Sequence, residues 1–204
     1  KKRYSYDEAN SRDEVGIVRG LAWTSVGGDT LSVEVNVLPG KGKFELTGQL
    51  GDVMKESAVA GISYIRSAGN RLHIKPEFFD THDIHIHIPE GAVPKDGPSA
   101  GITMATAMIS AITGIKVRAD VAMTGEITLR GRVLPIGGLK EKILAAKTAK
   151  IKTVLVPKKN RQDVEELEDE IVDGIELIYV DKMEDVLKEA LVRETPSESE
   201  NKGA

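Results

Sequence analysis

The sequence predicts a mixed α/β (α+β) domain in which strands come first and helices follow. Apolar and polar residues alternate over much of residues 14–38, as in half-buried strands. Residues 99–113 are apolar nearly all round, as in a buried helix. One late strand–helix–strand alternation covers residues 153–180. No linker is long enough to demand a second domain.

The first half of the chain is expected to supply four strands and one helix. Gly27-Gly28-Asp29 is expected to form the turn between the first two strands, and Gly69-Asn70 to end the helix. The strands are expected at residues 14–24, 30–38, 43–46 and 83–88, and the helix at 50–66.

In the second half, Ser99 is expected to open a central helix that runs to about Thr113 and is closed by Gly114. A hairpin over residues 127–135 turns at Arg130-Gly131. Further helices are expected at 139–150, 160–167 and from a capping-box-like start at 181–184 to about 192, with strands at 153–156 and 175–180.

Composition excludes several classes of protein. The chain has 204 residues, 40% of them hydrophobic, and a net charge of −4, which argues against a dedicated nucleic-acid module. No run approaches the roughly 18 apolar residues of a membrane span. The absence of cysteine excludes disulfides, thiol catalysis and cysteine zinc sites, and is compatible with a reducing cytosol. The missing initiator Met suggests a piece of a longer protein.

The segment Gly97-Pro98-Ser99-Ala100-Gly101 matches the G-x-S-x-G pattern of nucleophilic serines. The free N–H groups of a helix N-terminus would favour a serine alkoxide and hold an oxyanion. The alternative is that Ser99 is an ordinary helix N-cap, which is a frequent role of serine.

A nucleophilic serine needs a base, and the histidines fit poorly. All four precede Ser99, which excludes the α/β-hydrolase order. His85, Asp96 and Ser99 follow the chymotrypsin-like order of His, Asp and Ser. However, Asp96 lies only three residues before the serine, an awkward position from which to orient a distant imidazole.

Lysine is the remaining candidate base. On a helical wheel of about 100° per residue, Lys142 falls between Ala146 and Ala149 on the small-residue face, where burial would lower its pKa. The alternatives are that Lys142 extends to solvent or pairs with an acid such as Glu126.

Two further patterns are weak. His85 and His87 share a strand face with Asp83, but no further spaced ligand or H-E-x-x-H motif supports a metal site. Residues 40–43 (GKGK) lack the spacing of a phosphate-binding loop, and the chain contains no Walker A motif. This piece of the chain is therefore not expected to hydrolyse ATP.

Three segments together resemble the proteolytic domain of bacterial Lon proteases: residues 94–101 (PKDGPSAG), 123–131 (MTGEITLRG) and 134–142 (LPIGGLKEK). The resemblance extends from about Asp13 to Val192. It implies a Lon-type fold with strands first, a buried central helix carrying the nucleophile and a C-terminal strand–helix part. It divides the chain into a connector from a missing ATPase region (1–12), the proteolytic domain (13–193) and a disordered tail (194–204).

The resemblance also implies roles for individual residues. Ser99 matches the family's nucleophile, Lys142 its general base, and Thr124 the threonine that would hold the lysine amine. Backbone N–H groups of the turn from Gly97 through Pro98 to Ser99 would stabilise the oxyanion. A separate hypothesis is that an ion pair between Asp96 and Lys142 raises the lysine pKa and switches the pair off.

The activity implied is that of a serine endopeptidase that degrades unfolded, damaged or regulatory proteins through an acyl-enzyme. The resemblance also implies a cytoplasmic homohexameric ring. ATP and Mg would be used by an AAA+ ATPase region elsewhere in the same full-length chain, while this piece needs no cofactor and has no membrane or nucleic-acid partner. Two alternatives stay open: a non-catalytic assembly platform, and a metal-dependent hydrolase built on His85 and His87.

Overall fold

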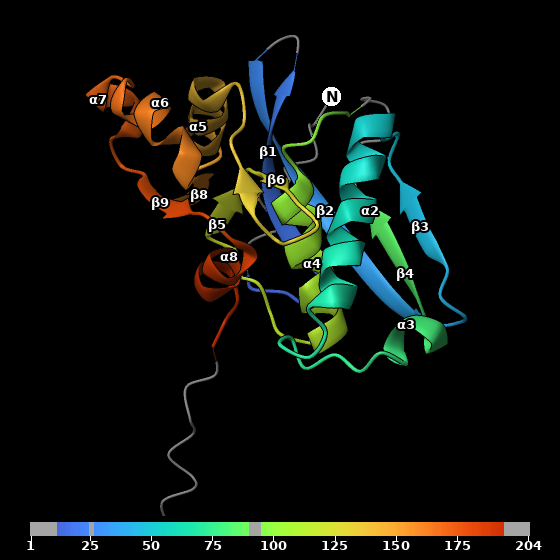
Figure 1. Ribbon diagram of the computed structural model, residues 1–204. Coiled ribbons are helices and arrows are strands. Elements are labelled where there is room, and N and C mark those ends of the chain that lie inside the picture. Colours follow the sequence, from blue (N-terminus) through green and yellow to red (C-terminus); the bar gives the residue numbers. More distant parts are fainter. Residues whose placement is uncertain (1–11, 25–26, 90–94, 194–204) are drawn as a thin grey trace, which may run out of the picture.

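The fold is built on one mixed seven-stranded sheet (Figure 1). The computed structural model describes residues 12–24, 27–89 and 95–193. The strands are β1 (Ile17–Thr24), β2 (Gly27–Pro39), β3 (Phe44–Thr47), β4 (His82–His87), β5 (Val121–Met123), β6 (Glu126–Ile127), β7 (Val133–Leu134), β8 (Thr153–Pro157) and β9 (Glu176–Val180). Their order in the sheet is β3-β4-β2-β1-β5-β8-β9, and the short β6 and β7 pair separately as a hairpin. Strand β2 is antiparallel to both of its neighbours, β1 and β4, and the other neighbouring strands of the sheet are parallel.

Helices cover both faces of this sheet. Alternate residues of β8 belong to different hydrophobic clusters: Leu155 packs with the α2–α4 side, and Val154 and Val156 pack with the α5 side. The helices are α2 (Asp52–Ser67), α3 (Phe78–Thr81), α4 (Gly101–Thr113), α5 (Leu139–Thr148), the 3-10 turn η1 (Lys158–Asn160), α6 (Arg161–Glu165), α7 (Asp169–Val172) and α8 (Met183–Ala190).

Helix α4 is the buried centre of the domain, as its apolar composition predicts. Every residue from Gly101 to Ser110 is buried between the sheet and α2. Helix α2 approaches closely at Gly61, where an added Cβ atom would lie 3.2 Å from the Met108 side chain. Gly114 ends α4 in the left-handed conformation that favours glycine, as predicted.

Most expected elements are confirmed, with shifts of one to three residues at their ends. The main error is the first turn: Gly27, Gly28 and Asp29 belong to β2 and pair with Thr24, Trp23 and Ala22. Residues 25–26 between the two strands lie outside the described ranges.

Three short elements have no counterpart in the sequence analysis: β5, α3 and α7. With only three or four residues each, they are too short to display a hydrophobic period. At the start of α8, Asp185 rather than Glu184 accepts the backbone N–H groups of Asp181 and Lys182. The expected connector and tail lie outside the described residues, apart from Arg12. Among the helices that are described, none combines the length and apolarity needed to cross a bilayer.

Candidate active site

One cleft of about 640 Å³ brings Ser99 and Lys142 together from segments far apart in the sequence. It lies where α4 begins, between the β1–β2 hairpin and the start of α5. The residues that line the cleft are Leu21, Ala22, Trp23, Leu31, Met54, Asp96, Gly97, Pro98, Ser99, Ala100, Pro135, Ile136, Gly137, Gly138, Glu141 and Lys142.

Ser99 lies just before α4 and is not its N-cap. The N-cap is Ala100, and no side chain of the described residues caps this helix end. The N-cap interpretation of Ser99 is therefore wrong, and its half-buried side chain belongs to the cleft wall. Gly97 has a φ of 106°, a conformation that glycine adopts without strain, so the bend that presents Ser99 depends on this glycine.

The segment that follows β5 fixes the serine from the other side. The Gly125 N–H donates to the Ser99 carbonyl at 2.8 Å, and the Ile102 N–H donates to the Gly125 carbonyl at 3.1 Å. Thr124 precedes this bridge and is fully buried, and its hydroxyl has no hydrogen-bond partner among the described residues. An unpartnered buried hydroxyl is costly, so Thr124 is available to a polar group of the site.

Lys142 lies on the buried face of α5, as the helical wheel predicts. Its side chain is only 3% exposed, which rules out the expectation that it extends to solvent. No ion pair joins it to Glu126 or to any other acid of the described residues. Burial lowers the pKa of Lys142 to about 8, because removal from water disfavours the ammonium.

The β1–β2 hairpin positions the helix that carries this lysine. A Cβ atom added to Gly28 would lie 2.0 Å from the backbone carbonyl oxygen of Glu141. Only glycine permits this close approach of β2 to the first turn of α5. On the neighbouring strand, Trp23 packs against Gly138 and is 61% exposed at the cleft.

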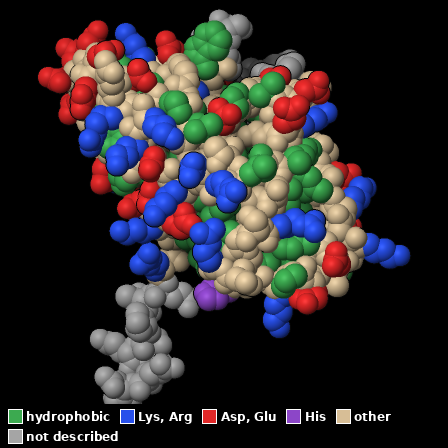
Figure 2. Space-filling view, in the orientation of Figure 1, with side chains coloured by type: hydrophobic (Ala, Val, Ile, Leu, Met, Phe, Trp, Pro, Cys, Tyr) green, Lys and Arg blue, Asp and Glu red, His purple; other side chains and the backbone are tan. Residues whose placement is uncertain are grey.

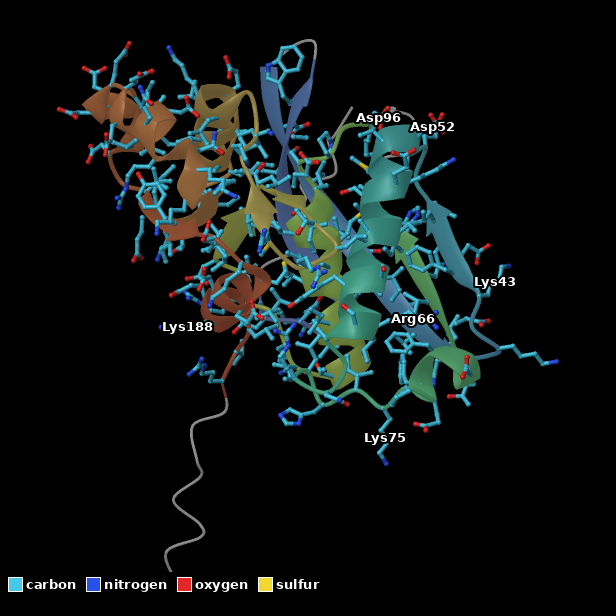
Figure 3. All side chains as sticks on the ribbon, viewed as in Figure 1. Lys43, Asp52, Arg66, Lys75, Asp96 and Lys188 are labelled. Atoms are coloured by element: carbon cyan, nitrogen blue, oxygen red, sulfur yellow. The ribbon has the colours of Figure 1, made fainter. Side chains whose placement is uncertain are left out.

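Asp96 anchors the loop before Ser99 to helix α2. Its carboxylate accepts the backbone N–H groups of Met54 at 3.0 Å and Gly97 at 2.8 Å, and these bonds lower its pKa. Helix α2 has no side-chain cap of its own, so Asp96 serves its N-terminus from a distant segment (Figure 3). The expected ion pair with Lys142 is not formed, and burial alone explains the pKa shift of the lysine.

These contacts limit which backbone N–H groups of the Gly97–Ser99 turn can donate to an oxyanion. The Gly97 N–H already donates to Asp96, and Pro98 has no N–H. Within this turn, the N–H of Ser99 itself is the donor that makes no hydrogen bond to the described residues.

The histidine cluster lies elsewhere, on strand β4. The Thr47 hydroxyl contacts His85 Nε2 at 2.7 Å and His87 Nδ1 at 2.6 Å. The Asp83 carboxylate accepts the N–H groups of residues 41–43, so the backbone of the GKGK segment binds a carboxylate of the chain itself. The described residues contain no group of three potential metal ligands.

Sequence reasoning did not single out Trp23, Leu31 or Met54 as residues of the cleft. They come from β1, β2 and α2, and no motif marks them. An isolated tryptophan beside an expected hairpin is the one signal that the sequence offers for them. Their placement depends on how the hairpin and α2 pack around the start of α4.

Comparison with known protein families places the chain among proteolytic domains of the Lon type. The family profile "Lon protease (S16) C-terminal proteolytic domain" matches residues 1–193, and the chain belongs to this family. A Lon protease of Lachnoclostridium phytofermentans is 70% identical over 94% of this chain and 24% of its own length. Lon protease 1 of Bacillus subtilis is 58% identical over 95% of this chain and 25% of its own length. The chain thus spans about a quarter of these curated relatives.

Proposed function

We propose that this domain is a serine endopeptidase in which Ser99 is the nucleophile and Lys142 the general base. The observation that carries the proposal is a buried lysine, with its pKa lowered to about 8, in the same cleft as a serine at the start of a helix. At pH 7 about a tenth of such a lysine is neutral, against roughly three in ten thousand for a pKa of 10.5. The base form is therefore present near neutral pH.

The proposed reaction is acyl transfer in two steps. Neutral Lys142 takes the proton of the Ser99 hydroxyl while the serine oxygen attacks a peptide carbonyl. The resulting oxyanion accepts the Ser99 N–H, and its collapse passes the lysine proton to the leaving amine, which leaves an ester on Ser99. Lys142 then takes a proton from water, and the hydroxide adds to the ester. The tetrahedral intermediate collapses while the lysine proton passes to the Ser99 oxygen, which releases the carboxylic acid, the free serine and neutral Lys142.

The contacts of the cleft also indicate which residues would support Ser99 and Lys142. The unpartnered Thr124 hydroxyl is the proposed partner of the lysine amine, because β5 and Gly125 tie Thr124 to the Ser99 segment. Trp23, Leu31 and Met54 make part of the cleft wall apolar, which favours a polypeptide with an apolar side chain near the cleaved bond.

The wider proposal concerns the whole protein. The relatives are about four times as long as this chain, in agreement with an AAA+ ATPase region in the same polypeptide that uses ATP and Mg. We infer a cytoplasmic homohexamer that degrades unfolded, damaged or regulatory proteins. This part rests on membership of the Lon family rather than on contacts in the domain.

The test is hydrolysis of a fluorogenic peptide and of unfolded casein by the wild type, Ser99→Ala and Lys142→Met, with Lys140→Met as control. Lys140 is exposed on the same helix, so its substitution removes a lysine without entering the cleft. Cleavage in the presence of a chelator, lost in Ser99→Ala and Lys142→Met but kept in Lys140→Met, is the expected result.

Other outcomes separate the alternatives. Cleavage that survives Ser99→Ala would refute the serine mechanism. Cleavage that a chelator abolishes would favour the metal-dependent hydrolase. If the wild type cleaves neither substrate, alone or in the full-length chain with ATP, the domain is an assembly platform.

A further inference from the structure

A second cavity, larger than the catalytic cleft, lies beside helix α8. We call it the α8 cavity; its volume is about 880 Å³, within the range of small-molecule sites. It shares no lining residue with the cleft that contains Ser99. Figure 3 shows Lys188, which lines the α8 cavity, and Asp96, which lines the cleft, at widely separated points of the molecule.

The walls of the α8 cavity combine aliphatic and cationic side chains. Four cationic residues line it: Arg71, Lys116, Lys188 and Arg193. Among the described residues that line it, Glu184 is the one acidic side chain, and it pairs with Arg71 at 3.3 Å. Lys116 and Lys188 form no ion pair with any described residue, so positive charge predominates among the described residues that line the cavity. Figure 2 shows Lys and Arg side chains gathered on the part of the surface where α8 lies. Aliphatic side chains complete the wall: Leu72, Ile115, Leu187, Leu191 and Val192.

An unpartnered buried hydroxyl belongs to the same cavity. Tyr64 is 1% exposed, and its hydroxyl has no hydrogen-bond partner among the described residues. One edge of the ring lies against Gly131, where an added Cβ atom would be 2.7 Å from Tyr64 Cζ. Burial raises the pKa of the Tyr64 phenol, the Glu184 charge raises it further and the Arg71 charge lowers it, and both charged residues line the same cavity. A buried phenol normally finds an acceptor, and here a bound group could supply it.

We propose that the α8 cavity binds an amphipathic carboxylate, meaning a free carboxylate group attached to an aliphatic body. The carboxylate would accept from the Tyr64 hydroxyl and neutralise the unpaired lysines, and the aliphatic body would contact the leucine and valine side chains. The Glu184 carboxylate disfavours a dianion such as phosphate, because two negative charges would then face it across the cavity.

Two sources have this chemistry: the C-terminal end of an apolar peptide, and a fatty acid. Acetyl-leucyl-leucine represents the first and decanoate the second. Acetyl-leucyl-leucine amide and 1-decanol are the matched neutral compounds. The proposal stands independently of the peptidase activity, since neither Ser99 nor Lys142 touches this cavity.

The test is calorimetric titration of the 204-residue chain with each compound and with inorganic phosphate. At least one carboxylate is expected to bind with one-to-one stoichiometry, and its neutral counterpart and phosphate about tenfold more weakly or not at all. Which carboxylate binds identifies the source. Binding by neither carboxylate at about 5 mM, or equal binding of a carboxylate and its neutral counterpart, would overturn the proposal.

Three variants locate the site. Tyr64→Phe removes only the hydroxyl and Lys188→Gln removes one cation, and each is expected to weaken binding about fivefold or more. Lys159→Gln, at an exposed position of η1, is the matched control and is expected to leave binding unchanged. Tyr64→Phe is also expected to keep or raise the unfolding temperature, because the hydroxyl that it removes has no hydrogen-bond partner in the described part of the chain. Unchanged binding in Tyr64→Phe and Lys188→Gln, or equal weakening in Lys159→Gln, would refute this location.

Discussion

Replacing Lys142 by methionine should stabilise the domain while it removes the proposed activity. Methionine has a similar length and shape, so the buried site on α5 stays filled. The substitution removes an ammonium that is 3% exposed and has no carboxylate partner in the described part of the chain. Burial of such a charge is unfavourable, and a protein retains it only where function requires it.

The pKa sets the size of the effect. The Lys142 pKa is 10.5 in the unfolded chain and about 8 in the folded domain, and this difference corresponds to about 3 kcal/mol of lost stability. At pH 7 the lysine is protonated in the unfolded chain and about nine-tenths protonated in the folded domain, so nearly all of this cost is present. Between pH 8 and 10.5 the folded domain has released the proton and the unfolded chain still holds it, so wild-type stability rises with pH. The advantage of Lys142→Met should therefore fall to about 1 kcal/mol at pH 10.

The assay is urea unfolding of the wild type, Lys142→Met and Lys140→Met at pH 7 and pH 10, at one protein concentration. For a domain of this size, about 3 kcal/mol also predicts an increase of roughly 6–12 °C in unfolding temperature at pH 7. Lys140→Met should change stability little, because this side chain is exposed. The reasoning would be refuted if Lys142→Met were less stable than the wild type at pH 7. It would also be refuted if the difference in free energy of unfolding between the two proteins did not decrease from pH 7 to pH 10.

Three more predictions follow from the site. The rate of peptide cleavage should rise with pH up to about 8 and then level off, because neutral Lys142 is the proposed base; a flat profile from pH 6 to 9 would exclude this role. Gly28→Ala should destabilise the domain by about 1–3 kcal/mol and lower activity, since its Cβ would overlap the backbone of α5, whereas Gly137→Ala, with no atom within 4 Å of the new Cβ, should be mild in thermal unfolding. Asp96→Asn should reduce activity and stability at pH 7, because the carboxylate holds the Ser99 loop to α2, and the stability difference should vanish as the pH falls through the lowered Asp96 pKa; increased activity would instead support an inhibitory pair with Lys142.

The sequence predicts most of the fold because the long elements carry their own hydrophobic period. The β1–β2 pair, α2, α4 and α5 all appear within a few residues of their expected ends. The prediction of a turn at Gly27-Gly28-Asp29 is wrong, because turn propensity indicates only that residues are able to form a turn. Here Gly28 lies in a strand, and its lack of a side chain allows the close approach to α5. Strand β5 is missed because a buried strand of three residues has no visible alternation.

For the candidate site, too, some features are predictable from the sequence and others depend on the tertiary structure. The sequence by itself singles out Ser99 through its motif and Lys142 through its position on the small-residue face of a helix, since both signals are local. Only the tertiary structure decides that the two residues line one cleft, that Lys142 has no acidic partner in the described chain, and that Asp96 binds the N-terminus of α2. The physical reason is that pKa values and ion pairs depend on burial and on neighbours from distant segments, which packing alone brings together.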